Sequence, residues 1–120
     1  MKINYSNRTE YRNKQGELHR EDGPALIDEM GHQYYYQNGK LHREDGPAVS
    51  DHGCHEYYQN GQLHRTDGPA IDYNGYQSYY QNGQLHREDG PAIIWSDGKK
   101  EYWIKGKQLT KDEYENQISK

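Results

Sequence analysis

The octapeptide LHREDGPA occurs at residues 18–25, 41–48 and 85–92, and a near-copy, LHRTDGPA, occupies residues 63–70. A catalytic site needs each chemical group once, whereas a stacked architecture needs the same groups in every unit. Recurrence at a short fixed period is typical of repeat proteins, in which each repeat is one supersecondary unit that packs on its neighbours. The octapeptide therefore predicts a tandem repeat array before any other residue is interpreted.

Each repeat contains two sites at which the sequence favours a tight turn. Asn-Gly is the strongest short hairpin signal, because both central residues of a type I′ turn need positive φ. The pairs are Asn38 with Gly39, Asn60 with Gly61 and Asn82 with Gly83. The second site holds His52-Gly53, Asn74-Gly75 and three-residue loops that end at Gly31 and Gly98. Two turns per repeat predict antiparallel β-hairpins.

Pairing the strands outward from these turns divides the side chains between two faces, because opposite residues share a face and neighbours alternate. In the third repeat the register pairs Tyr80 with Leu85, Tyr79 with His86, Ile71 with Ser78 and Ala70 with Tyr79. The first face carries Leu18, Leu41, Leu63, Leu85, Leu26, Val49, Ile71, Ile93, Tyr36, Tyr58, Tyr80 and Trp103. The second face carries Ala25, Ala48, Ala70, Ala92, His19, His42, His64, His86, Tyr35, Tyr57, Tyr79 and Tyr102. We expect the aliphatic first face to be buried. For the tyrosines of the second face two alternatives stay open: the small alanines leave the rings accessible, or the rings shield the backbone of the sheet.

The EDGP segment allows two arrangements. If it is a turn, each repeat has three strands and successive repeats alternate in direction. If it is a bend within a longer strand, each repeat is a two-stranded hairpin and all copies stack in the same way, which is the arrangement we favour. The predicted fold class is all-β: about four tandem antiparallel hairpin repeats forming one elongated twisted sheet. The expected repeats span residues 11–35, 36–57, 58–79 and 80–102 of a single domain, 1–120.

Residues 103–120 are expected to cap the array. Thr110 followed by Glu113 has the spacing of a capping box, which predicts a short amphipathic helix that contains Tyr114 and Ile118. A helix at this place would cover the open edge of the sheet.

Composition limits the classes of function. Hydrophobic residues make up 30% of the chain and the mean hydropathy is −1.49, but 13 Tyr and two Trp favour a thin aromatic core over disorder. The net charge of −4 argues against a surface for duplex nucleic acid. A single cysteine, Cys54, and the lack of a long apolar run predict a soluble, cytoplasmic protein without a membrane partner.

The repeated segments EYYQNGQLHR (residues 56–65) and SYYQNGQLHREDGPA (residues 78–92) resemble MORN-type repeats, particularly the MORN-variant form. The resemblance covers residues 11–109 and implies tandem β-hairpins in a grooved sheet. MORN-type repeats serve as scaffolds, docking modules and small immunity or antitoxin proteins. The NGxLHRxDGPA ending is similar to arrays in viral and phage-encoded proteins, which implies an inhibitor of a host defence or toxin protein in the host-cell cytoplasm.

The repeated polar residues are expected to be structural. We expect each histidine to hydrogen-bond a following turn, since columns of rings on successive hairpins lie too far apart to share one metal ion. Asp45, Asp67 and Asp89 are expected to form turn clamps with the arginine two residues earlier. Cys54 lies near His52 and His55, but side chains that flank a hairpin turn splay apart, which argues against a nucleophilic site. Neither a catalytic site nor a metal or other cofactor is predicted.

The remaining candidates for function are the aromatic and imidazole columns of the second face. Tyrosine is enriched at protein interfaces because it offers a large contact area at little entropic cost. We therefore predict a non-enzymatic protein-binding module, with partner contacts at Tyr35, Tyr57, Tyr79, Tyr102, His42, His64 and His86. Three alternatives stay open: a structural module that self-associates through sheet edges, an acidic inhibitor that mimics nucleic acid, and a small-ligand binder.

Overall fold

The computed structural model describes residues 1–119 and divides into two compact units, Met1–Gln62 and Leu63–Lys120. Both units consist of short antiparallel hairpins, and the one helix among the described residues is α1 (Lys111–Ile118). The predicted all-β class, with tandem antiparallel hairpin repeats and a short C-terminal helix, is confirmed. No helix in this part of the chain is long and apolar enough to cross a membrane.

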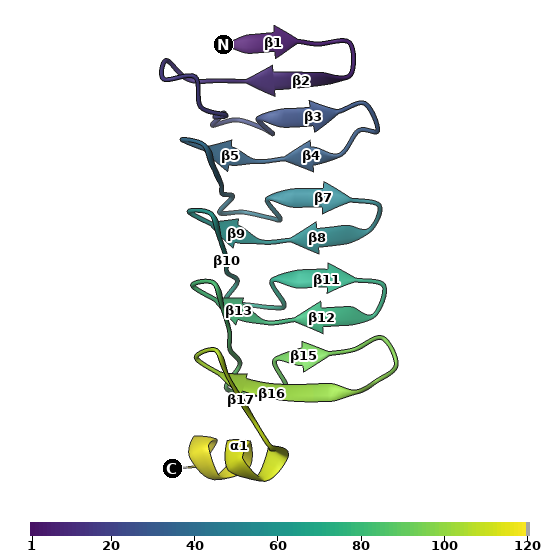
Figure 1. Ribbon diagram of the computed structural model, residues 1–120, viewed down its shortest axis with the longest axis vertical. Coiled ribbons are helices and arrows are strands. Elements are labelled where there is room, and N and C mark those ends of the chain that lie inside the picture. Colours follow the sequence, from purple (N-terminus) through teal and green to yellow (C-terminus); the bar gives the residue numbers. More distant parts are fainter. Residues whose placement is uncertain (120) are drawn as a thin grey trace. The chain divides into compact units, whose positions relative to one another are not determined.

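The N-terminal unit, Met1–Gln62, has a main sheet with the strand order β1-β2-β3-β4-β7-β8 (Figure 1). Its strands are β1 (Lys2–Asn4), β2 (Arg8–Tyr11), β3 (Leu26–Asp28), β4 (Gln33–Tyr34), β7 (Val49–Asp51) and β8 (Cys54–Glu56). A second kind of hairpin, here called a side hairpin, branches from the main sheet in each repeat. Its strands in this unit are β5 (Tyr36–Gln37), β6 (Lys40–Leu41) and β9 (Tyr58–Gln59), and β10 (Gln62–Leu63) follows at the unit boundary.

The C-terminal unit repeats the same plan and ends in the helix (Figure 1). The strand order of its main sheet is β11-β12-β15-β16-β17. These strands are β11 (Ile71–Tyr73), β12 (Tyr76–Ser78), β15 (Ile93–Ile94), β16 (Lys100–Ile104) and β17 (Lys107–Leu109). The side hairpin is formed by β13 (Tyr80–Gln81) and β14 (Gln84–Leu85).

The turns have the backbone conformations that the sequence predicts. Asn82 and Gly83 both have positive φ, 51° and 80°, as a type I′ turn requires. His52 and Gly53 are alike, with φ of 42° and 83°. In the three-residue loops the glycine alone is left-handed, as at Gly31, whose φ is 86°. Local turn chemistry therefore determines where each hairpin reverses.

The predicted strand register is confirmed except at one point. Tyr80 pairs with Leu85 and Ile71 pairs with Ser78. The expected pairing of Ala70 with Tyr79 is wrong, because the ladder ends at Ser78 and the backbone N–H of Tyr79 donates instead to Ala92 O at 2.7 Å. Tyr79 is the residue at which the chain leaves the main sheet and enters the side hairpin.

The EDGP segments are bends, and they do not reverse the direction of the repeats. β11 and β15 are both antiparallel to β12, so they run in the same direction, as β3 and β7 do on either side of β4. The favoured alternative is confirmed in this respect. It is wrong that the bend lies within one longer strand, since irregular chain joins each side hairpin to the next main-sheet strand.

Buried residues lie on both faces, which corrects the expectation that the alanine face is open. The four repeated alanines have no exposed surface: Ala25, Ala48, Ala70 and Ala92. Ala92 donates to Glu101 O at 2.8 Å and accepts from Tyr79 N at 2.7 Å, so backbone lies close on both sides. On the aliphatic face Val49 and Ile93 are buried, but Leu63 and Ile71 are only half-buried. The small side chain is what permits this close approach, and it does not mark an open surface.

The capping box at α1 is confirmed. Thr110 Oγ1 accepts from Glu113 N at 3.1 Å, and Glu113 Oε1 accepts from Thr110 N at 2.9 Å. The N–H of Thr110 stabilises the charged carboxylate, so the pKa of Glu113 lies below its ordinary value. Tyr114 is buried as predicted, whereas Ile118 is 42% exposed, so the expected apolar face is limited to its first turn.

Candidate functional site

The repeated histidines connect each hairpin to the next. Nδ1 of His42 accepts a hydrogen bond from the backbone N–H of Asn60 at 3.0 Å. The same bond joins His19 to Asn38, His64 to Asn82 and His86 to Lys105. With Nδ1 as the acceptor, a neutral ring carries its proton on Nε2. The prediction that these rings bond a following turn is confirmed.

The repeated arginines are held from three directions. Arg43 Cζ lies 3.9 Å from the centroid of the Tyr35 ring, Nε contacts Asp45 Oδ1 at 3.1 Å, and Nη1 donates to Pro47 O at 3.2 Å. A Cβ at Gly46 would lie 3.0 Å from Arg43 Cζ, which explains why glycine follows each aspartate. Equivalent ion pairs join Arg20 to Asp22, Arg65 to Asp67 and Arg87 to Asp89. The predicted arginine–aspartate clamp is confirmed.

The tyrosines predicted to bind a partner are half-buried. Arg87 covers the ring of Tyr79 at 3.9 Å, as Arg43 covers that of Tyr35, and the ring of Tyr102 lies 4.8 Å from that of Tyr114. A guanidinium therefore occupies one face of the Tyr35 and Tyr79 rings, and the alanines beside them do not leave these two rings open. Tyr57 is also half-buried.

Two equivalent grooves, one in each unit, bring the repeated residues together. The first has a volume of about 630 Å³ and lies between segments 20–23 and 42–45, with Tyr35 on its wall. The second has a volume of about 500 Å³ and lies between segments 65–68 and 86–89, with Tyr79 in the corresponding place. Both contain two EDG or TDG bends, so each groove is a product of two successive repeats.

The rim of each groove is acidic. In the first groove the side chains of Glu44 and Asp45 are 83% and 88% exposed. Arg43 contacts Asp45 and a backbone carbonyl, so its charge is already engaged. Glu44 contacts His42 Nε2 at 3.7 Å, and among the described residues no shorter contact to its carboxylate is seen. Accessible carboxylates therefore face solvent along a wall of half-buried aromatic and imidazole rings.

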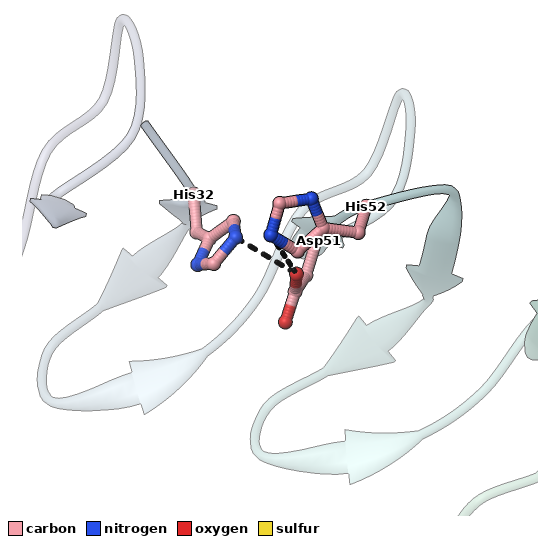
Figure 2. Close-up of side chains that lie close together, drawn as sticks. All are labelled: His32, Asp51 and His52. Atoms are coloured by element: carbon pink, nitrogen blue, oxygen red, sulfur yellow. Dashed lines mark ion pairs between the residues drawn. The ribbon is translucent and has the colours of Figure 1, made fainter. Parts of the chain in front are cut away.

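A different cluster of polar residues occurs once, at the turns of the N-terminal unit. Figure 2 shows His32, which follows the β3–β4 turn, and Asp51 and His52 from the β7–β8 turn. Nε2 of His32 lies 2.9 Å from Asp51 Oδ1, and Nε2 of His52 lies 3.9 Å from the same oxygen. The two imidazole rings meet edge to face, with centroids 4.5 Å apart. The nitrogen and oxygen atoms all lie within 4.8 Å of one another, which is the spacing of a candidate metal-binding group.

Asp28 fixes the orientation of His32 in this cluster. Asp28 Oδ2 contacts His32 Nδ1 at 2.8 Å, and Oδ1 accepts from the backbone N–H groups of His32 and Met30, each at 3.0 Å. Burial alone would raise the pKa of Asp28, but these hydrogen bonds hold it below its ordinary value. The carboxylate is therefore a charged acceptor that aligns the ring.

The sequence places His52 beside Cys54 and His55 and gives no other partner for it. Cys54 Sγ contacts Glu56 Oε2 at 3.8 Å and His55 is exposed, whereas His52 turns toward His32. The missed partner is 20 residues away from His52 in the sequence. The strand register would have found it, because β4 pairs with β7 and so places the two turns side by side.

Comparisons of the chain with protein-family models, with curated proteins and with solved structures gave no match.

Proposed function

We propose that the chain is a non-enzymatic protein-binding module whose repeated grooves hold an extended, basic segment of another protein. The observation that carries this proposal is the recurrence of one groove, with the same residue types, in both units. A ligand that needs several equivalent contacts is matched by a repeat array, whereas a small substrate touches a single repeat.

The chemistry of the groove favours a cationic occupant. Glu21 and Glu44 project from the rim of the first groove with side chains 84% and 83% exposed. The neighbouring arginines are engaged with tyrosine rings, aspartates and carbonyls, so they are poor competitors for these glutamates. Lysine or arginine side chains of a partner would meet carboxylates at the rim and aromatic edges at the wall, which gives charge complementarity and contact area together.

The proposal extends to inhibition of the bound protein. The likeness of the repeats to those of phage-encoded and antitoxin proteins supports a partner that is a host defence or toxin protein, met in the host cytoplasm. A basic surface is common on proteins that act on nucleic acids, so a partner with such a surface is the expected target class.

Fluorescence anisotropy tests the charge complementarity. The probe is a labelled peptide of alternating lysine and serine, and the control probe replaces lysine with glutamate. We expect only the basic peptide to bind, with an affinity that falls as salt rises. The double variant Glu21→Gln/Glu44→Gln and the single variant Glu88→Gln are expected to weaken binding about tenfold. Glu115→Gln, an exposed change of the same kind on α1, is the matched control and keeps the original affinity.

Other outcomes would separate the alternatives. Tyr79→Ala, checked for folding by circular dichroism, measures the aromatic contribution; loss of binding there with normal binding of the glutamate variants would place recognition on the tyrosines. Equal affinity for both peptides would refute an acidic binding surface. Strong concentration-dependent self-association in light scattering, together with no peptide binding, would favour the assembly module.

A further inference from the structure

His32 and Asp51 occupy positions at which the C-terminal unit has a pair of packed aromatic rings. His32 is equivalent to Tyr76, because each directly follows the glycine of its turn. Asp51 is equivalent to Trp95, because each is the third residue after the repeated alanine with which its segment reaches the main sheet. Tyr76 and Trp95 pack ring to ring, with centroids 5.1 Å apart. The contact between successive repeats at this place can therefore be made by two aromatic side chains. The polar groups of the N-terminal unit are not needed to stack the repeats.

His52 adds a second departure from the repeat. It is the first residue of a type I′ turn with φ of 42°. Four other two-residue turns have asparagine there, at Asn38, Asn60, Asn74 and Asn82, and one has Lys105. Asparagine tolerates the left-handed region better than most residues with longer side chains. Histidine at this position directs an imidazole toward His32 and Asp51 (Figure 2).

Hydrogen bonding leaves one nitrogen of His32 available. If Nδ1–H donates to Asp28 Oδ2 at 2.8 Å, the neutral ring has its lone pair on Nε2. That nitrogen is buried, faces Asp51 Oδ1 at 2.9 Å and has no hydrogen bond of acceptable geometry among the described residues. A lone pair opposite a carboxylate oxygen is repulsive, and a cation between the two atoms removes the repulsion.

We propose that Nε2 of His32, Oδ1 of Asp51 and Nε2 of His52 form a Zn²⁺ site with a fourth position open to water. Two imidazoles and one carboxylate are a common ligand set for zinc, whose bonds to N and O are about 2.0–2.2 Å long. In a tetrahedral site such ligand atoms lie about 3.3–3.5 Å apart. His32 Nε2 and Asp51 Oδ1 need to separate slightly from 2.9 Å, and His52 Nε2 needs to approach from 3.9 Å. The side chain of His52 is 67% exposed, so it is free to make this adjustment.

Asp28 would act as the outer partner of the site. A ligating histidine usually donates its other ring N–H to a carboxylate or carbonyl, which fixes the tautomer and strengthens the ligand. Asp28 is already oriented for this role by the backbone N–H groups of Met30 and His32. The ion would connect the β3–β4 turn to the β7–β8 turn and so link two successive repeats of the N-terminal unit.

Isothermal titration of the untagged, chelator-treated chain with ZnCl₂ tests the site. We expect one zinc ion per chain, a higher melting temperature with stoichiometric zinc, and the visible absorption of four-coordinate cobalt when Co²⁺ replaces zinc. His52→Asn is the most informative variant, because asparagine is the residue of four other turns and folding is preserved. It should weaken zinc binding about 100-fold or more, while Asp28→Asn should weaken it about 10–100-fold. His55→Asn, an exposed neighbouring histidine, is the matched control and leaves the affinity unchanged.

A second variant separates metal binding from stacking. His32→Tyr/Asp51→Trp transplants the aromatic pair of the C-terminal unit into the N-terminal unit. We expect a folded chain that no longer binds zinc and whose melting temperature is insensitive to the ion. Absence of zinc binding by the original chain, or binding of the same affinity by His52→Asn, would overturn the proposal.

Discussion

Tyr114 makes, in the last repeat, a contact that two repeats of the N-terminal unit receive from a glutamine of the following repeat. In the N-terminal unit Gln37 Nε2 donates to Arg20 O at 3.1 Å, and Gln59 Nε2 donates to Arg43 O at 3.0 Å. The corresponding carbonyl of Arg87 accepts instead from the hydroxyl of Tyr114 at 2.7 Å. The hydroxyl oxygen of Tyr114 in turn accepts from the backbone N–H of Gly90 at 2.9 Å. Tyr114→Phe removes both bonds and keeps the ring.

The expected cost follows from these two contacts. An ordinary hydrogen bond contributes about 1 kcal/mol, and a backbone group left without a partner in a buried place costs about 1–3 kcal/mol. Arg87 and Gly90 are half-buried, so water compensates in part. We therefore expect the free energy of unfolding of the C-terminal unit to fall by about 2–3 kcal/mol. For a protein of this size that corresponds to a fall in melting temperature of about 6–15 °C.

Urea denaturation and thermal scans followed by circular dichroism measure this change. Tyr73→Phe, in the same unit but exposed, is the control and should alter the free energy of unfolding by less than about 0.5 kcal/mol. Hydrogen exchange at the Gly90 amide should accelerate in Tyr114→Phe but not in the control. A shift in melting temperature of about 2 °C or less is too small to interpret. Such a result for Tyr114→Phe would refute the view that the Tyr114 hydroxyl stabilises the last repeat through Arg87 O and Gly90 N.

Two further predictions concern the core and the N-terminal charges. Ala70→Leu places a larger side chain where no surface is exposed, and overpacking should lower the free energy of unfolding by about 1–3 kcal/mol or more. Leu63→Ala, at a half-buried position, should lower it by about 1–2 kcal/mol in the same urea assay. A larger effect of Leu63→Ala than of Ala70→Leu would show that the aliphatic face is the more tightly packed one. Glu10 accepts from Arg8 Nε at 2.6 Å and from Arg12 Nε at 2.9 Å, and the bond from Arg8 above all holds the pKa of Glu10 below 4.5 against the opposing effect of burial. Since the folded pKa is depressed, this stabilisation is complete above the unfolded pKa and is lost as pH falls through the folded value. The original chain should therefore exceed Glu10→Gln in stability at neutral pH, with a difference that shrinks below about pH 4.5 and contradicts the argument if it grows there.

The features that local chemistry determines were predictable from the sequence. Asn82-Gly83 reverses the chain because asparagine and glycine accept positive φ, and this turn alone sets the pairing of Tyr80 with Leu85. The capping box of Thr110 and Glu113 is equally local. Each of these features depends on residues at most five positions apart, so the amino-acid types are sufficient to specify them.

The features that were not predicted depend on how close separate segments come in space. An alanine in an alternating pattern is compatible with an exposed face and with a tightly packed one, and only the approach of neighbouring backbone to Ala92 decides between them. The bend at Tyr79 is similar, because its N–H finds Ala92 O in the next repeat. Alternation of side chains carries no information about where a strand leaves its sheet.

The zinc proposal depends on the same distinction between what repeats and what does not. Packing constraints act on every repeat, so the residues that satisfy them recur, as the clamp of Arg43 with Asp45 recurs. A group that occurs once, at a position where the fold accepts a different solution elsewhere in the chain, is not explained by those constraints. His32 and Asp51 meet this condition, because Tyr76 and Trp95 make the equivalent contact by ring packing, with centroids 5.1 Å apart. In a repeat protein, equivalent positions of successive repeats can be compared with one another. A residue type that recurs is explained by stacking, and a polar group found in one repeat alone is the one to test for chemistry.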